Sequence, residues 1–143
     1  MPGVDAYALP LRRLDDAIAI RRHIIDRFER AAVDPTIVAE GALNVVVCGG
    51  GPTGVEMAGA LADLSRTVLA TDFRRIDPSK ARVLLVEGSE RVLGGFPAHL
   101  SESAQAQLKE LGVELVLGQR VTRIDARGAT PRTSRGGAES APP

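Results

Sequence analysis

Four glycines within six residues form the part of this sequence best suited to hold a phosphate group. They occur in the loop Gly49-Gly50-Gly51-Pro52-Thr53-Gly54, which matches the pattern G-x-G-x-x-G. In such a pattern the first glycine permits a tight turn, the second lets the backbone approach a pyrophosphate, and the third lets a helix pack close to a strand. We therefore predict that residues 49–54 bind the pyrophosphate of a dinucleotide, the alternative being a glycine-rich turn in another kind of α/β protein.

The segments on both sides of the loop support this prediction. Residues 43–48 (LNVVVC) form a short β-branched run with almost no alternation, which is typical of a strand buried on both faces of a parallel sheet. After the loop, apolar residues return at helical spacing through Val55, Ala58 and Leu61. The amino terminus of that helix would offer unpaired N–H groups and a partial positive charge to phosphates, and Pro52 is tolerated in its first turn.

A single carboxylate, Glu87, completes the expected nucleotide site. It ends a second apolar run, residues 82–87 (RVLLVE), and at that place in a dinucleotide-binding sheet a carboxylate accepts hydrogen bonds from the adenosine ribose hydroxyls. It would repel a 2′-phosphate, so NADH is expected to bind better than NADPH. The alternative for Glu87 is an ordinary solvated side chain at a strand end. No arginine follows Glu87 directly, and the nearby Arg91 is expected to be solvated.

The remaining apolar pattern predicts the elements that position the loop and the carboxylate. A helix is expected over residues 99–111 and a third strand over residues 113–117, with residues 120–124 as a candidate fourth strand. Strand, helix, strand, helix, strand is the order of the Rossmann-like βαβαβ half of a doubly wound α/β fold with a parallel sheet. We expect this domain to span residues 43–126.

A connecting segment with a helix is expected to precede the domain, over residues 1–42. Residues 1–13 have the pattern of an irregular stretch, a helix over residues 14–32 follows, and a short helix over residues 37–40 ends the segment. The helix over residues 14–32 carries one apolar face, made of Leu14, Ile18, Ile25, Phe28 and Ala32, with Ile24 beside it. Residues 127–143 change abruptly to Gly, Pro, Ser, Arg and Ala without periodic apolar positions, and we expect them to form a disordered tail.

The overall composition argues against several classes of protein. The formal net charge is zero, so electrostatics predict binding neither to nucleic acid nor to an anionic membrane. The apolar runs are too short for a transmembrane segment, and no signal peptide is expected. The one cysteine, Cys48, is expected to be a small buried residue and favours a reducing, cytoplasmic location. Two histidines and one cysteine, widely spaced, do not predict a metal site.

Three stretches resemble one enzyme family. The strings GGGPTGVEMAGALADL and DFRRIDPSKARVLLVEGSERVLGGFPAHLSESAQAQLKELGVEL are similar to the NADH-binding domain of type II NADH dehydrogenases, which are FAD-dependent NADH:quinone oxidoreductases of the two-dinucleotide-fold flavoproteins. The upstream string ALPLRRLDDAIAIRRHIIDRFERA resembles the region that leads into that domain. The combination of PTGVE, RIDP and LVEGSERVL is more specific to this family than the glycine pattern.

The resemblance implies roles for individual residues. Residues 49–54 would hold the pyrophosphate of NADH, and Glu87 would hold its adenosine ribose. Glu56 matches the glutamate of PTGVE, which lies near the nicotinamide and the flavin in the family, so it is the candidate catalytic residue. From the sequence alone, a carboxylate in the first turn of that helix would equally serve to complement the helix dipole. Hydride would pass from NADH to FAD and then to quinone in the full-length family.

Departures from the family pattern limit the function expected of these 143 residues. They show no second glycine fingerprint for FAD, and none of the terminal helices that hold family members to the inner face of the cell membrane. In the family a small antiparallel unit follows the third parallel strand and the chain then returns to complete the sheet, whereas here the regular pattern stops near residues 124–125. We therefore expect a truncated enzyme, a non-catalytic NAD(H)-binding module that works with a separate FAD-domain chain, or a non-functional remnant. Without a later strand, residues 45–48 would lie at an exposed sheet edge.

Overall fold

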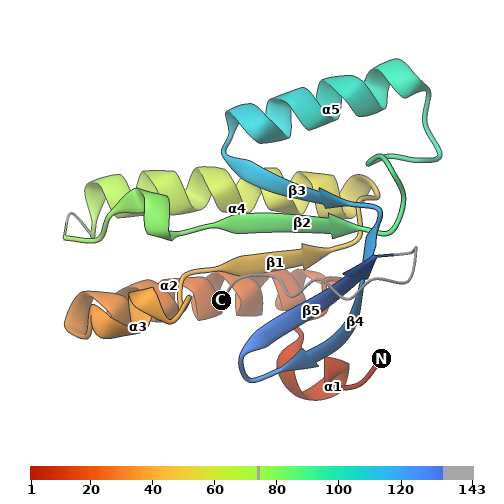
Figure 1. Ribbon diagram of the computed structural model, residues 1–143. Helices are drawn as coiled ribbons and strands as arrows, with labels where there is room; N and C mark the ends of the chain where they lie inside the picture. Colours follow the sequence, from red (N-terminus) through yellow and green to blue (C-terminus); the bar gives the residue numbers. More distant parts are fainter. Residues whose placement is uncertain (74, 134–143) are drawn as a thin grey trace.

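The computed structural model describes residues 1–73 and 75–133, and its centre is a parallel three-stranded sheet (Figure 1). The strands run in the order β1, β2, β3, which are Val45–Cys48, Val83–Glu87 and Val113–Leu117. Val45 pairs with Val83, and Val83 pairs with Val113, so the three strands start level with one another. Apart from Glu87 at the end of β2 and Glu114 within β3, the strands consist of apolar residues and Cys48, which favours a buried position in a parallel sheet.

Two helices connect the three strands. Helix α4 (Pro52–Thr71) follows β1 and packs on β2, and helix α5 (Ala98–Glu110) precedes β3 and packs on it. A short 3-10 helix, η1 (Pro78–Lys80), leads into β2. The βαβαβ order predicted from the sequence is therefore confirmed, and the α/β fold brings the carboxyl ends of the strands to one edge of the sheet.

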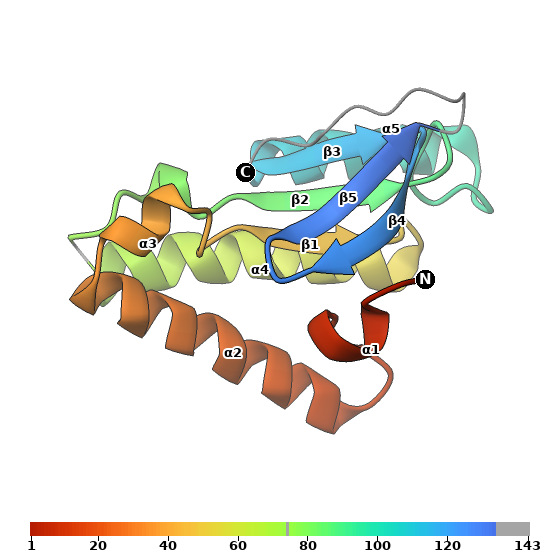
Figure 2. The ribbon, with the colours of Figure 1, turned by 60° about the horizontal axis from the view of Figure 1, so that its bottom comes forward.

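The connecting segment contributes helix α2 (Leu14–Val33) and the short helix α3 (Thr36–Ala39). In Figure 1 α2 lies below β1 and beside α3, and Figure 2 shows it running obliquely below α4. Its buried side chains are Ile24, Phe28 and Ala31, and the ring of Phe28 lies 5.9 Å from that of Phe73. The sequence predicts instead an apolar face that includes Leu14 and Ile18, but these are 76% and 50% exposed. The fully buried side chains of α2 all lie in its carboxyl-terminal half, so periodicity alone overestimates its buried face.

Two small elements at the ends of the described chain differ from the prediction. Residues 4–7 form a single helical turn, α1 (Val4–Tyr7), within the stretch predicted to be irregular. Strand β4 (Gln119–Asp125) confirms the candidate fourth strand over residues 120–124. It pairs antiparallel with β5 (Gly128–Thr133), which lies where the sequence predicts a disordered tail. These elements support each other, because the N–H of Ile124 donates a hydrogen bond to the carbonyl of Pro2 at 3.1 Å. The rest of the predicted tail, residues 134–143, lies outside the described residues.

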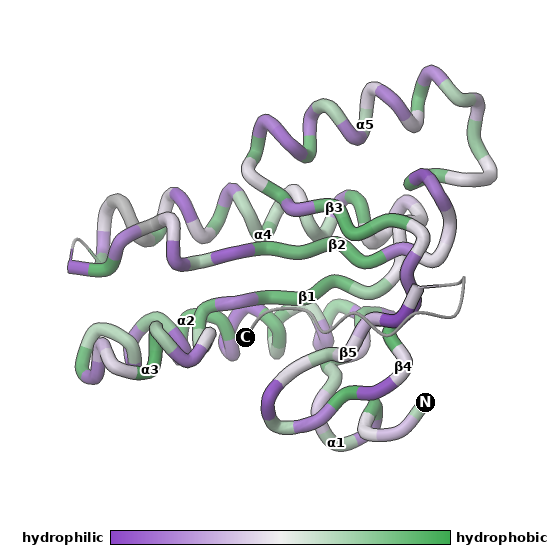
Figure 3. The backbone as a smooth tube through the Cα atoms, in the orientation of Figure 1, coloured by the Kyte–Doolittle hydropathy of each residue, from purple (hydrophilic) through white to green (hydrophobic). Residues whose placement is uncertain are grey.

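Hydropathy distinguishes the parallel sheet from the hairpin (Figure 3). Strands β1 to β3 are mainly hydrophobic, whereas β4 and β5 mix polar and apolar residues. Within residues 1–73 and 75–133, none of the helices combines the length and the apolar character needed to cross a bilayer.

Strand β1 lies at one edge of the described sheet, as the sequence predicts, because only β2 pairs with it there. Val46 is 37% exposed, and Cys48 at the end of the strand is exposed as well. The prediction that Cys48 is buried is therefore wrong. Its physical cause is that one face of β1 is left without cover, so the alternate side chains of Val46 and Cys48 on that face are exposed.

Candidate functional site

The glycine loop joins the carboxyl end of β1 to the amino end of α4, as the sequence predicts. Gly49 has a φ of 107°, a backbone conformation that glycine adopts readily and other residues rarely adopt. Its N–H donates to the carbonyl of Val86 at 2.8 Å, which ties the turn to the neighbouring strand β2. A Cβ atom on Gly54 would overlap the carbonyl oxygen of Gly49. The close approach of helix and turn thus requires glycine at the third position of the motif.

The amino terminus of α4 is open to a ligand. The helix begins at Pro52 with Gly51 as its N-cap, and no side chain caps its first N–H groups. A Cβ built on Gly51 has no atom within 4 Å, and Pro52 and Thr53 are exposed. The first N–H groups of a helix have no partner within it, and the helix dipole adds partial positive charge at that point. This terminus has the chemistry of a binding site for a phosphate or pyrophosphate group.

The carboxylate of Glu87 lies directly against the loop. Its Oε2 accepts a hydrogen bond from the N–H of Gly50 at 2.6 Å, and its Oε1 accepts one from the N–H of Ser89 at 2.7 Å. Burial favours the neutral acid, but these hydrogen bonds and the positive charge of Arg120 outweigh it and hold the pKa of Glu87 below its ordinary value. Glu87 is therefore ionised at neutral pH, and each oxygen keeps a lone pair for a further donor.

The segment after β2 closes over one side of the loop. The N–H of Leu93 donates to the carbonyl of Gly50 at 2.7 Å, and the hydroxyl of Ser101 donates to the carbonyl of Val92 at 2.6 Å. These two hydrogen bonds fix the segment between the glycine loop and α5. The loop is consequently held from two sides, by Glu87 and by Leu93.

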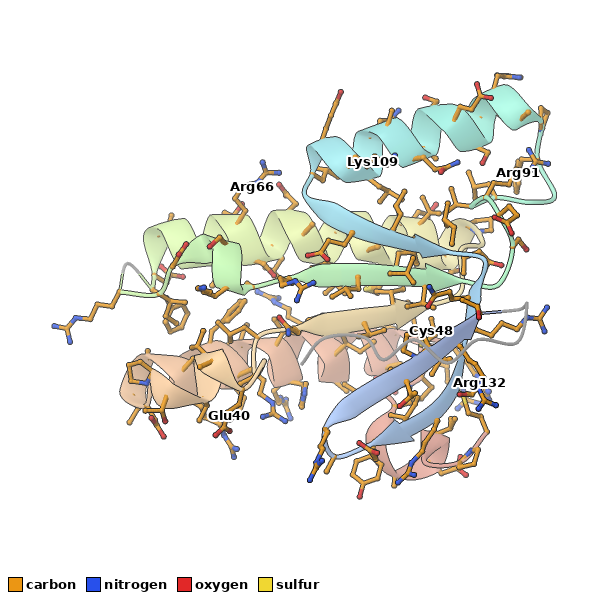
Figure 4. All side chains as sticks on the ribbon, in the orientation of Figure 1. Glu40, Cys48, Arg66, Arg91, Lys109 and Arg132 are labelled. Atoms are coloured by element: carbon orange, nitrogen blue, oxygen red, sulfur yellow. The ribbon has the colours of Figure 1, made fainter. Side chains whose placement is uncertain are left out.

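Arg91 belongs to the same segment and differs from its prediction. It is partly buried, and its Nη2 donates to the carbonyl of Gly94 at 3.0 Å. Its Nη1 is buried without a hydrogen-bond partner in the described part of the chain. The prediction that Arg91 is solvated is therefore wrong. Figure 4 places it at the end of the sheet where Cys48 lies, away from Glu40 and Arg66.

Glu56 lies on the exposed surface of α4, one turn beyond the loop. Because α4 begins at Pro52, Glu56 belongs to the second helical turn, and the first turn holds no acidic residue. The interpretation that Glu56 complements the helix dipole from the first turn is therefore wrong. The structure brings residues 49–54 and Glu87 together, whereas Glu56 makes none of the hydrogen bonds described for that group.

Hollows of the surface occur away from this site. One is lined by residues of α2, among them Ile18, Arg21 and Ile25. Another lies near the amino ends of β2 and β3 and is lined by residues that include Arg82 and Glu114. Neither contains residues 49–54 or Glu87. The candidate site is formed by backbone groups of the glycine loop and one carboxylate.

Comparison with known proteins gives consistent matches. Residues 1–140 match the family model described as pyridine nucleotide-disulphide oxidoreductase. Type II NADH:quinone oxidoreductase Ndh of Mycobacterium tuberculosis is 42% identical over 132 residues, which are 91% of this chain and 28% of that protein. External alternative NAD(P)H-ubiquinone oxidoreductase B2 of Arabidopsis thaliana is 33% identical over 144 residues, which are 99% of this chain and 25% of that protein.

A solved structure agrees with these sequence matches. The structure of NDH2 from Plasmodium falciparum in complex with NADH superposes with a TM-score of 0.90 at 25% sequence identity. The match covers 99% of this chain and 29% of that chain. This chain therefore spans less than a third of the length of the relatives that it matches.

Proposed function

The chain belongs to the pyridine nucleotide-disulphide oxidoreductase family, and from this membership we propose that it is the NADH-binding portion of a type II NADH dehydrogenase. One observation carries the proposal: the uncapped amino terminus of α4 lies beside the ionised carboxylate of Glu87. The first offers N–H donors to a diphosphate, and the second offers acceptors to a ribose. The likeness to a solved NDH2 in complex with NADH supports the same ligand.

Residues of this chain fit a dinucleotide at three points. The exposed backbone of residues 51–53 would bind the pyrophosphate, because a side chain is absent at Gly51 and the helix dipole favours anions there. Glu87 would accept hydrogen bonds from the ribose hydroxyls while it holds Gly50 in place. Glu56, on the exposed surface of the same helix, is proposed to lie near the nicotinamide. NADH would supply a hydride, and FAD in the proposed full-length enzyme would supply the redox chemistry that links NADH to quinone.

Calorimetric titration of the chain with NADH and NADPH tests this proposal. We expect one NADH per chain and at least about tenfold weaker binding of NADPH, because Glu87 repels the 2′-phosphate. Glu87→Ala should weaken NADH binding, whereas Glu102→Ala, on the exposed surface of α5, should not. Equal affinity for the two nucleotides, or unchanged NADH binding by Glu87→Ala, would overturn the assignment of the nucleotide.

The edge position of β1 favours a second candidate function, an NAD(H)-binding module completed by a separate FAD-domain chain. Among the described residues only β2 pairs with β1, and Val46 presents an apolar side chain at that edge. Leu14 and Ile18 add exposed apolar surface on α2. Such surfaces are typical of a domain that packs against further polypeptide. In either form the proposed location is the cytoplasm, at the inner face of the membrane in the full-length enzyme.

Mixing the chain with a purified FAD-domain chain separates the two candidates. Co-purification and NADH:quinone turnover only in the mixture would support the module. Stoichiometric FAD bound by this chain, or quinone reduction by it alone, would contradict both. A chain without slowly exchanging amides in β2 would instead be the non-functional remnant.

A further inference from the structure

The side chain of Arg120, on β4, lies across the backbone that follows Glu87. A Cβ atom built on Gly88 would stand 2.7 Å from the Nε and 2.8 Å from the Cγ of Arg120. The arginine therefore occupies the space that any side chain at position 88 would need. Its charge is close enough to Glu87 to stabilise the ionised carboxylate. A hairpin that the sequence does not predict thus adds a cation to the ribose end of the proposed nucleotide site.

The strand β5 places a second arginine beside the first. Arg120 and Arg132 are directly opposed in the antiparallel pairing of β4 with β5, and both are exposed. Like charges in opposed positions repel each other, and none of the ion pairs found within the described ranges involves either arginine. Figure 4 places Arg132 at the end of the sheet where Cys48 lies. Arg120 is thus the arginine whose charge acts on Glu87, and Arg132 adds a like charge opposite it on β5.

We propose that Arg120 is a second determinant of nucleotide choice in this site, offsetting the charge of Glu87 and so moderating the rejection of a 2′-phosphate. This inference rests on the proposed function, because it concerns the same nucleotide. Glu87 alone would present a full negative charge to the 2′ position of the ribose. A guanidinium beside it reduces that repulsion, and its planar set of N–H donors suits phosphate oxygens. The selectivity for NADH over NADPH then reflects the balance between Glu87 and Arg120.

An arginine that only supports the fold would behave differently. Its removal would change the stability of the chain and weaken both nucleotides alike. A charge that acts on the 2′-phosphate changes the ratio of the two dissociation constants, because NADH carries a neutral hydroxyl at that position. The ratio is therefore the quantity that separates the two roles.

Calorimetric titration of NADH and NADPH into the wild-type chain and three variants at low ionic strength tests the inference. Arg120→Gln should raise the ratio of the NADPH to the NADH dissociation constant roughly tenfold, as expected for the loss of one positive charge near a phosphate. Gly88→Ala keeps the charge but displaces the arginine, so it should raise the ratio in the same direction. Arg123→Gln removes a charge further along β4 that pairs with Asp125 at 3.3 Å, and it should leave the ratio unchanged.

The possible outcomes decide between this inference and the proposed function. NADH binding with an unchanged ratio in Arg120→Gln would overturn the inference alone. An equal rise in Arg123→Gln would also overturn it, since a general loss of positive charge would then explain the result. If the wild-type chain bound no NADH, the proposed function would fall and this inference with it.

Discussion

The hydrogen bonds of Glu87 predict that its replacement destabilises the fold as well as the nucleotide site. In the wild-type chain one carboxylate accepts two backbone N–H groups, from Gly50 at 2.6 Å and from Ser89 at 2.7 Å. Glu87→Gln preserves the shape of the side chain but only one acceptor oxygen. Its NH2 group must then face the other N–H, and two donors cannot pair. Either the glycine loop or the turn after β2 therefore loses a hydrogen bond.

The size of the effect follows from the bond that is lost. A hydrogen bond to a charged acceptor contributes about 1.5–3 kcal/mol, and an unpaired buried donor costs about 1–3 kcal/mol. Glu87 is only partly buried, so water compensates some of the loss. We expect the free energy of unfolding to fall by about 1.5 kcal/mol, which corresponds to a decrease of roughly 6 °C in Tm for a domain of this size.

Urea unfolding followed by circular dichroism measures this change at neutral pH. The matched control is Glu102→Gln, because Glu102 is an exposed glutamate of α5. That variant should stay within about 0.5 kcal/mol of the wild-type chain. If Glu87→Gln unfolded at the same urea concentration as the control, the two hydrogen bonds would not hold the loop, and the reasoning would be refuted.

The pH dependence of the same comparison adds a second test. Folding lowers the pKa of Glu87 from its ordinary 4.5, despite the opposing effect of burial, because Gly50, Ser89 and Arg120 favour the carboxylate. Its stabilisation is therefore complete above the pKa of the unfolded chain and is lost as pH falls through the lower folded value. The difference in stability between the wild-type chain and Glu87→Gln should shrink between neutral pH and about pH 3. A difference that grew in acid would contradict this sign.

Two further pairs of substitutions test the glycine loop and the edge of the sheet. Gly54→Ala should destabilise the chain by about 1–3 kcal/mol in urea unfolding, because its Cβ would overlap the carbonyl oxygen of Gly49. In Gly51→Ala the new Cβ has no atom within 4 Å, so this variant should keep nearly the same stability but bind NADH more weakly. Equal stability of the two alanine variants would contradict the close packing at Gly54. Val46→Lys should reduce self-association in sedimentation experiments by placing a charge at the exposed sheet edge. Val33→Lys, at an 87% exposed position of α2, should leave self-association unchanged. Equal self-association of the two lysine variants would argue against β1 as the surface through which copies of the chain associate.

The parallel sheet and the loop could be predicted because their signals are local. A strand buried in a parallel sheet is rich in consecutive apolar residues, and residues 83–86 and 115–117 are such runs. The glycine loop between residues 45–48 and α4 depends on a turn, a helix start and a close approach, each of which constrains particular positions. Local physics and the fold agree there, so the sequence is sufficient.

The small outer elements could not be predicted, because they form only through tertiary contacts. Strand β5 has the sequence GATPRT, and a proline within it has the pattern of a loop. Pro131 is nevertheless buried opposite Val121 in the hairpin. The single turn α1 carries no periodic apolar face, and a backbone hydrogen bond between Pro2 and Ile124 ties the segment before it to β4. Both elements depend on contacts with residues distant in the chain, so a short window of sequence does not predict them.

The site shows the same division between local and tertiary information. The end of an apolar strand identifies Glu87 as a candidate ribose ligand. Its hydrogen bond to Gly50 joins residues 37 positions apart, and no sequence motif indicates it. Arg91 is the arginine that lies near Glu87 in the sequence, but its guanidinium donates a hydrogen bond to the carbonyl of Gly94 in its own loop. The arginine that reaches Glu87 is Arg120, from a hairpin far along the chain.

Amide hydrogen exchange with and without NADH tests the central claim, that the glycine loop and Glu87 form a nucleotide site. NADH should slow exchange in peptides that cover residues 49–56 and 87–93, since the ligand would bind these N–H groups or hold the segments that contain them. Peptides from α2 should show no change. Slowed exchange confined to α2, or no change anywhere at saturating NADH, would contradict the account.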